Sequence, residues 1–261
     1  MLDGFTETEF QFEGVTRPVH RRGAGPGVLV MHEMPGITPE VLGFATRLAD
    51  AGFSVAMPDL FGEPGRPMTP GYTLYQIGRA CLRHEFSVLA SRSASPITEW
   101  LRALCRDLHA EVGGPGVGAI GMCFTGNFAL TLYVDPWVMA PVLSQPSLPF
   151  ALTPGLGRGM HVSDADLAVV VRRVRDEGGK VLGLRFTGDP SCPGRRFGAL
   201  KDALGDGFEA IEIDSSRGNA HGIGPAAHSV LTHEFVDQAG HPTKEAFSRV
   251  VAFFRERLTP E

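Results

Sequence analysis

The sequence lacks the features that mark membrane and secreted proteins. It contains no run of about eighteen apolar residues, which a membrane-spanning helix requires. Its N-terminus has no charged segment followed by an apolar core, so no signal peptide is visible. These absences predict a cytoplasmic protein with no membrane partner.

Blocks of like charge are also missing. The 261 residues carry a formal net charge of −5, and the sequence pI is about 6.0. A nucleic-acid-binding surface would require a cluster of basic residues, and none stands out. We therefore expect no nucleic-acid partner.

Cysteine is scarce, and none of the four cysteines stands in a Cys-x-x-Cys pair. This spacing argues against a structural zinc site and against a disulfide framework. Cys105 falls on the apolar stripe of a predicted helix, so we expect it in the core. The four are Cys81, Cys105, Cys123 and Cys192.

Short apolar runs alternate with helical patterns, which predicts parallel βαβ units. With no internal repeat and no linker, we expect one domain over residues 1–261, with a mostly parallel central sheet flanked by helices on both faces. Functional sites in such sheets lie at the C-terminal ends of the strands. The predicted strands are Glu7–Phe12, Thr16–His20, Val28–Met31, Phe53–Met57, Val117–Gly121, Trp137–Leu143, Lys180–Thr187 and Phe208–Ile213.

Helix start and stop residues bound the predicted helices. Thr38 and Ser163 are typical N-caps, and Gly52 and Gly178 are typical stop residues. Two segments rich in Gly and Pro, 60–78 and 144–162, are predicted to be irregular. The remaining helices are expected to begin at Ser95-Pro96 and to cover Phe124–Tyr133, Arg195–Leu204 and Thr243–Leu258.

One junction between an apolar strand and an apolar helix has no loop residues to spare. It reads Ala119-Ile-Gly-Met-Cys-Phe-Thr-Gly126, with Cys123 at the tip. Small residues flank the tip, as a nucleophile elbow requires, and the start of the helix favours a thiolate. Alternatively, Cys123 is a small hydrophobic residue buried between strand and helix.

A cysteine nucleophile needs a base, and the base needs an orienting acid. Asp189 follows the predicted strand Lys180–Thr187 through Gly188, although an Asp-Pro turn is the alternative role for this residue. After the last predicted strand, His221, His228 and His233 share a loop rich in Gly and Pro. No second cluster of carboxylates and histidines completes a metal site, so we expect no metal.

Four pieces in the same order along the chain resemble the dienelactone hydrolase family, the cysteine-dependent branch of the α/β-hydrolases. They are Met31-His-Glu-Met-Pro-Gly36, Pro58-Asp-Leu-Phe61, Gly121-Met-Cys-Phe-Thr-Gly126 and the turn at Asp189. The resemblance extends from about Val28 to Leu258. It implies an α/β-hydrolase fold.

The resemblance also implies roles for individual residues. Cys123, Asp189 and His228 would form the catalytic triad. The backbone N–H groups of Phe124 and Met34 would hold the oxyanion, and the Glu33 carboxylate would contact the thiol. For the base, Ala227-His-Ser-Val230 matches the family's histidine motif, while His221, the alternative, is closer to the preceding strand.

The chain departs from the family at two positions. Thr125 stands where the family usually has Gly, and is expected to crowd the start of the helix. Thr232 stands where the founding type has an arginine that binds the substrate's carboxylate. A dicarboxylate-like dienelactone is therefore a doubtful substrate, unless Arg79, Arg83 or Arg92 substitutes for that arginine.

The predicted activity is hydrolysis of a small-molecule carboxylic ester or lactone through an acyl-enzyme, with neither a metal nor an organic cofactor. The alternatives are an acyl or thioester transferase on the same scaffold, and a non-catalytic protein that binds small molecules. The sequence predicts neither the natural substrate nor the oligomeric state.

Overall fold

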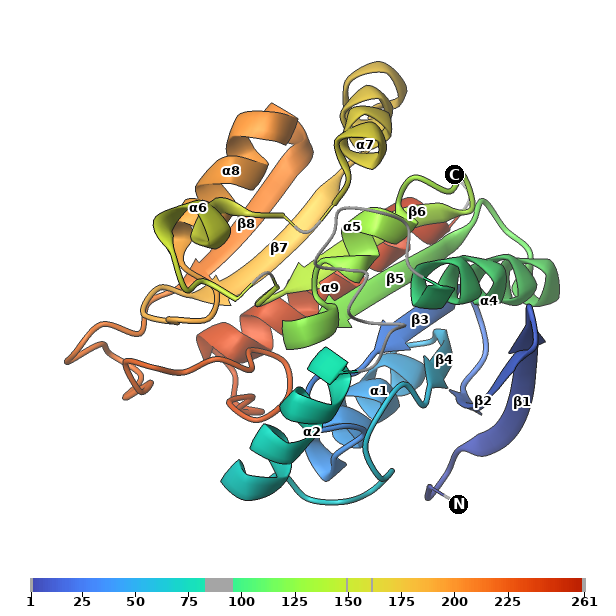
Figure 1. Cartoon of the computed structure of the whole chain (residues 1–261), viewed down its shortest axis with the longest axis horizontal. Helices are drawn as coiled ribbons and strands as arrows, with labels where there is room; N and C mark the ends of the chain where they lie inside the picture. The colour runs from blue at the N-terminus through green and yellow to red at the C-terminus, as the bar shows by residue number, and fades with distance from the viewer. Residues whose placement is uncertain (1, 83–95, 149, 161, 260–261) are drawn as a thin grey trace.

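A computed structural model describes residues 2–82, 96–148, 150–160 and 162–259 (Figure 1). Its eight strands form one sheet in the order β1-β2-β4-β3-β5-β6-β7-β8. β2 pairs antiparallel with β1 and β4, and every other pair is parallel. The strands are β1 (Thr6–Phe12), β2 (Val15–Arg22), β3 (Gly27–Met31), β4 (Ser54–Pro58), β5 (Val117–Met122), β6 (Val138–Ser144), β7 (Val181–Phe186) and β8 (Phe208–Ile213).

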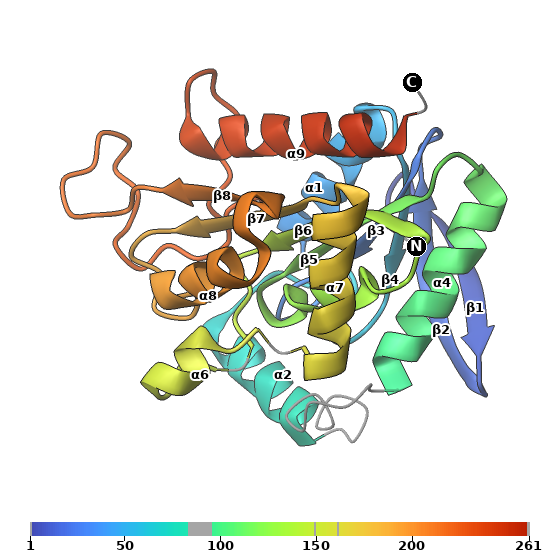
Figure 2. The ribbon, with the colours of Figure 1, turned by 90° about the horizontal axis from the view of Figure 1, so that it is seen from above.

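Helices cover both faces of this sheet, as predicted. α1 and α9 lie on one face, while α4, α5, α7 and α8 lie on the other (Figure 2). All residues of β3, β5 and β7 are therefore buried, which explains their continuous apolar runs. The helices are α1 (Pro39–Asp50), α2 (Pro70–Leu82), α4 (Pro96–Val112), α5 (Phe128–Leu132), α6 (Pro154–Arg158), α7 (Asp164–Glu177), α8 (Gly194–Leu204) and α9 (Pro242–Leu258).

The predicted cap residues lie at helix ends. The Thr38 side chain accepts a hydrogen bond from the Val41 N–H at the start of α1. Ser163 does the same for Asp166 at the start of α7, and Gly178 ends that helix in the left-handed conformation. Cys105 is fully buried on α4, which confirms its predicted place in the core. Ser95, expected at the start of α4, lies outside the described residues.

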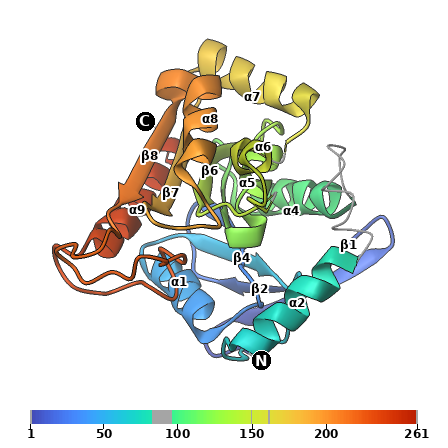
Figure 3. The same ribbon diagram turned by 60° about the vertical axis from the view of Figure 1, so that its left-hand side comes forward.

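Helix α2 begins at Pro70, inside segment 60–78, and continues to Leu82. The prediction that this segment is irregular was therefore wrong for its second half. The helix follows Thr69, whose side chain accepts a hydrogen bond from the Tyr72 N–H. Its buried residues Tyr72, Gln76 and Ala80 recur every four positions. The prediction of an irregular segment rested on its Gly and Pro content, yet Pro70, Gly71 and Gly78 lie within the helix. Figure 3 shows α2 well separated from α7 and α8, which lie beside β7 and β8.

The described residues of segment 144–162 are irregular apart from Ser144, which ends β6, and the short helix α6. Among the described residues, no helix combines the length and apolar character that a membrane span requires.

Candidate active site

The tip of the β5 turn has backbone geometry that is unusual for a cysteine. Cys123 follows β5 directly and has a φ of 53°, in the left-handed region that disfavours residues other than glycine. A Cβ at Gly121 would collide with the Thr125 carbonyl oxygen, and one at Gly126 would lie 2.5 Å from Pro146 Cα. Glycine is therefore required on both sides of the strained cysteine, as a nucleophile elbow demands.

The side chain of Thr125 is buried in this turn and makes specific hydrogen bonds. Its hydroxyl accepts from the Met122 N–H at 3.0 Å and lies 2.9 Å from the Met31 carbonyl oxygen, to which it donates. The chain forms a 3₁₀ turn over Cys123–Thr125, and α5 starts only at Phe128, so the predicted helix Phe124–Tyr133 was too long. Thr125 thus ties the end of β5 to the end of β3.

The ends of β3 and β5 carry the residues predicted for the oxyanion hole. Met31 in β3 pairs with Gly121 in β5. Met34 and Phe124, each three residues further along the chain, therefore lie just beyond the ends of neighbouring strands. The Phe61 ring packs edge-on against Phe124, with 5.9 Å between ring centroids. Phe61 follows β4, so this contact packs the segment after β4 against the turn after β5, and both Met34 and Phe124 are buried.

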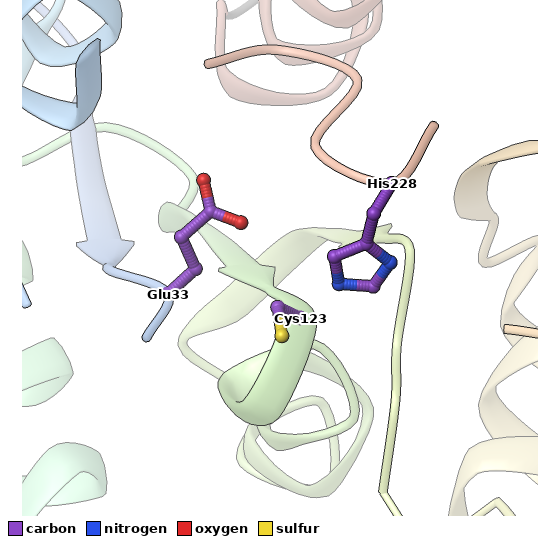
Figure 4. A group of neighbouring side chains, drawn as sticks. All are labelled: Glu33, Cys123 and His228. Atoms are coloured by element: carbon purple, nitrogen blue, oxygen red, sulfur yellow. The ribbon is translucent and has the colours of Figure 1, made fainter. Parts of the chain in front are cut away.

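Three side chains from distant parts of the sequence converge here. A carboxylate oxygen of Glu33, the Sγ of Cys123 and a ring nitrogen of His228 all lie within 4.8 Å of one another. Figure 4 shows the Cys123 sulfur between the Glu33 carboxylate and the His228 ring. Their spacing alone would also suit a metal ion, but the hydrogen bonds described below account for the arrangement without one.

His228, rather than His221, lies beside the predicted acid. His228 Nδ1 lies 2.6 Å from Asp189 Oδ2, and Asp189 Oδ1 accepts a hydrogen bond from the Ser191 N–H at 2.8 Å. His221 is exposed on the same loop, and its ring contacts that of His241. The structure therefore brings together Cys123, Asp189 and His228 and leaves His221 outside the group.

The environment of His228 favours its charged form. Burial by itself lowers the pKa, but the negative charge of a Cys123 thiolate and the hydrogen bond to Asp189 outweigh burial and hold the pKa well above its usual range. Because Nδ1 faces Asp189, Nε2 is left to exchange a proton with the thiol or substrate. This arrangement suits a thiolate–imidazolium pair.

Glu33 is buried, and three uncharged side chains hold its carboxylate. Oε2 accepts from the Ser229 hydroxyl at 2.7 Å and from Gln145 Nε2 at 3.3 Å, and Oε1 accepts from the Thr232 hydroxyl. Burial raises the pKa of Glu33, against the opposing effects of Thr232, His228 and Ser229. The hydroxyl of Thr232, the second departure from the family, is therefore engaged in a hydrogen bond to Glu33.

His32, directly before Glu33, has a structural part. Its Nε2 accepts a hydrogen bond from the Leu60 N–H at 3.1 Å, which leaves the ring proton on Nδ1 to donate to the Glu33 carbonyl oxygen. Burial lowers the pKa of His32 to about 4, so the ring is neutral at physiological pH. It fixes the ends of β3 and β4 and does not serve as a base.

The sequence did not predict two residues of the site, Ser147 beside the cysteine and Gln145 beside Glu33. Ser147 Oγ lies 3.3 Å from Cys123 Sγ, and the Ser147 N–H donates to the Cys123 carbonyl oxygen at 2.9 Å. Gln145 is fully buried and holds Glu33. Both residues fall in segment 144–162, whose Gly and Pro content predicted only an irregular loop. No sequence signal separates them from ordinary loop residues.

One arginine joins the loops on this side of the site. The Arg196 side chain is fully buried and donates to the carbonyl oxygens of Pro146, Leu156, Gly159 and Ser191. It thereby links the segment that carries Gln145 and Ser147 to α6 and to the turn after Asp189.

A hollow of about 210 Å³ lies beside α2. Its lining includes Arg17, Phe61, Gln76 and Arg79, but no member of the Cys123–Asp189–His228 group. Arg79, one of three candidates for a substrate-binding arginine, therefore lines this hollow; its guanidinium lies over the Tyr75 ring. The other two, Arg83 and Arg92, lie outside the described residues.

Comparison with known proteins identifies the family. Residues 14–157, more than half of the chain, match the profile of the dienelactone hydrolase family. No curated protein sequence matches this chain significantly.

Solved structures share the fold at low sequence identity. A dienelactone hydrolase-like promiscuous phosphotriesterase from metagenomic libraries is 19% identical, with a TM-score of 0.64 over 97% of this chain and 98% of that one. The dienelactone hydrolase from Anabaena variabilis is 15% identical, with a TM-score of 0.62 over 98% and 99% of the two chains. A cold-adapted esterase from an Arctic intertidal metagenomic library is 16% identical, with a TM-score of 0.60 over 99% and 97%.

Proposed function

This chain belongs to the dienelactone hydrolase family, and we propose that it hydrolyses a carboxylic ester or lactone with Cys123 as nucleophile, His228 as base and Asp189 as the group that orients the base. One observation carries the proposal. The strained Cys123 stands at the tip of the turn after β5, and the His228 ring beside it is hydrogen-bonded to the buried Asp189 at 2.6 Å.

The first half of the reaction forms an acyl-enzyme. The Cys123 thiolate attacks the carbonyl carbon of the substrate, and the N–H groups of Phe124 and Met34 stabilise the developing oxyanion. Each such donor typically contributes about 3 kcal/mol to transition-state stabilisation. When the tetrahedral intermediate collapses, the C–O bond breaks and His228 gives its proton to the leaving alkoxide.

The second half releases the acid. His228, now neutral, takes a proton from a water molecule as that water attacks the thioester carbonyl. Collapse of the second intermediate breaks the C–S bond and regenerates the thiolate beside protonated His228. Because a thiolate is also a good leaving group, we expect activated esters, enol-lactones and thioesters to react faster than amides.

The test is hydrolysis of p-nitrophenyl acetate by the wild type, Cys123→Ala and Cys123→Ser, together with iodoacetamide labelling mapped by mass spectrometry. The proposal expects activity that is lost in Cys123→Ala, and label on Cys123 before Cys105 and Cys192, which are buried. An inert wild type whose Cys123 reacts no faster than the other cysteines would contradict it and favour a non-catalytic binding protein.

An alcohol competition separates hydrolysis from acyl transfer. Adding a simple alcohol to the assay leaves the free acid as the main product of a hydrolase. A transferase would instead yield mainly the new ester. That result would assign acyl transfer in place of hydrolysis, with Cys123 still the nucleophile.

A further inference from the structure

Gln145 has a backbone conformation that is unfavourable for glutamine. It follows β6 directly, at a φ of 33°, and its side chain is fully buried. Residues other than glycine in the left-handed region carry a conformational cost, and such residues cluster at functional sites. Glycine would adopt this backbone more easily, so the side chain is the feature to explain.

The two ends of the Gln145 amide bind different parts of the site. Its Oε1 accepts hydrogen bonds from the Val230 N–H at 3.4 Å and from the Ser144 hydroxyl. Its Nε2 donates to Glu33 Oε2 at 3.3 Å. Val230 lies two residues after His228, so a single amide connects the loop of the histidine to the carboxylate beside the thiol.

The direction of these hydrogen bonds fixes the orientation of the amide. A backbone N–H can only donate, so Val230 requires the oxygen of Gln145 on its side. The amide NH₂ group must then face Glu33. An acceptor in its place would put two carboxylate-like oxygens together in a buried site, where unpaired polar groups are costly.

We infer that Gln145 is a positioning residue, whose amide holds the Glu33 carboxylate and the His228 loop in register around Cys123. This inference rests on the proposed function for its effect on turnover, but its effect on the thiol and on folding can be measured without any substrate. Gln145 touches neither Cys123 nor His228 among the described contacts, so it acts through the residues that it holds.

The variant Gln145→Gly separates the effect of the side-chain amide from the effect of the strained backbone. If Gln145 served only the fold, glycine would relieve the strain at φ 33° and leave reactivity unchanged or improved. We expect instead a folded variant whose Cys123 alkylation and ester hydrolysis are slower. A displacement of about 1 Å in such a site can cost on the order of a hundredfold in rate.

Gln145→Glu tests the donor end of the amide alone. It keeps an oxygen for Val230 but places an acceptor against Glu33, so we expect a lower midpoint of urea unfolding and slower alkylation of Cys123. In a Glu33→Gln background the neighbouring side chain is an amide that can donate to the introduced carboxylate after rotating, so the same substitution should cost less. A double-mutant cycle measures this difference.

The closing experiment measures iodoacetamide labelling of Cys123, urea unfolding and p-nitrophenyl acetate hydrolysis in the wild type, Q145G, Q145E, E33Q and E33Q/Q145E. Slower labelling in Q145G, and a cost of Q145E that shrinks in the E33Q background, support the inference. Wild-type reactivity in Q145G, or an equal cost of Q145E in both backgrounds, overturns it. A wild type that labels readily but hydrolyses nothing would contradict the proposed function and leave these two readouts intact.

Discussion

The hydroxyl of Ser147 lies 3.3 Å from the sulfur of Cys123, while the Ser147 N–H is bonded to the carbonyl oxygen of the same cysteine. A buried hydroxyl at this place can donate to the thiolate and favour it. A hydrogen bond to a charged group contributes about 1.5 kcal/mol or more, which corresponds to roughly tenfold in an equilibrium.

We therefore expect Ser147→Ala to slow alkylation of Cys123 at neutral pH on the order of tenfold. The measurement is the second-order rate of iodoacetamide labelling. Ser248→Ala, an exposed serine-to-alanine change on α9, is the matched control and should react like the wild type. Equal rates in all three proteins would show that the Ser147 hydroxyl does not support the thiolate.

The two candidate histidines give opposite predictions. His228→Ala removes the ring beside Asp189, and we expect ester hydrolysis to fall by about a thousandfold or more, as when a triad base is removed. His221→Ala changes an exposed ring and should leave the rate within about twofold, since surface substitutions away from a site have small effects. Steady-state kinetics on p-nitrophenyl acetate measures both, and the reverse result would assign the base to His221.

The raised pKa of Glu33 has a consequence for stability that depends on pH. In the unfolded chain its pKa is about 4.3. Because burial raises the pKa in the folded state, the contribution of Glu33 to stability is fully present below the unfolded pKa and is lost as pH rises through the folded pKa.

Glu33→Gln should therefore gain stability relative to the wild type as pH increases. The measurement is urea unfolding of both proteins from about pH 4, near the unfolded pKa, to about pH 8. The difference in unfolding free energy should grow with pH and then level off above the folded pKa. A difference that stays constant over this range would mean that Glu33 titrates alike in both states.

The buried hydroxyl of Thr125 should stabilise the junction between β3 and β5. Thr125→Val keeps the shape but leaves the Met122 N–H and the Met31 carbonyl oxygen without this partner, so we expect a loss of about 1–3 kcal/mol. Urea unfolding measures the loss. Thr125→Ser retains the hydroxyl and is the control; a valine variant as stable as the wild type would contradict the assigned role.

The sequence predicted the parts of this molecule that local rules govern. Continuous apolar runs correspond to strands buried on both faces, as in β3 and β5, and Gly121 with Gly126 identifies a turn too tight for other residues. The pairing of Asp189 with a histidine follows from element order in parallel sheets. The choice between His221 and His228 depended on resemblance to a family, because both residues share one irregular loop.

What the sequence could not predict depends on three-dimensional contacts. Pro70 starts helix α2 and Gly71 and Gly78 lie inside it, although these residue types are typical of loops, so the local pattern indicated an irregular segment. The start of α5 is delayed because Thr125 bonds to a neighbouring strand, a contact between residues 94 positions apart. Gln145 and Ser147 lie in a Pro-rich loop, and the conformation of such a loop cannot be predicted from hydrophobic periodicity.

The hydrogen bonds from Arg196 to four carbonyl oxygens limit which loops of this fold can change in length. Because one guanidinium serves loops that lead to Ser147, α6 and Asp189, a change in the length of any of them leaves buried donors without acceptors. Libraries that aim at new substrates should therefore keep Arg196 and its four carbonyl partners and vary the exposed side chains in and just before α6. Exposed Leu152, which is not among these partners, is a suitable first position.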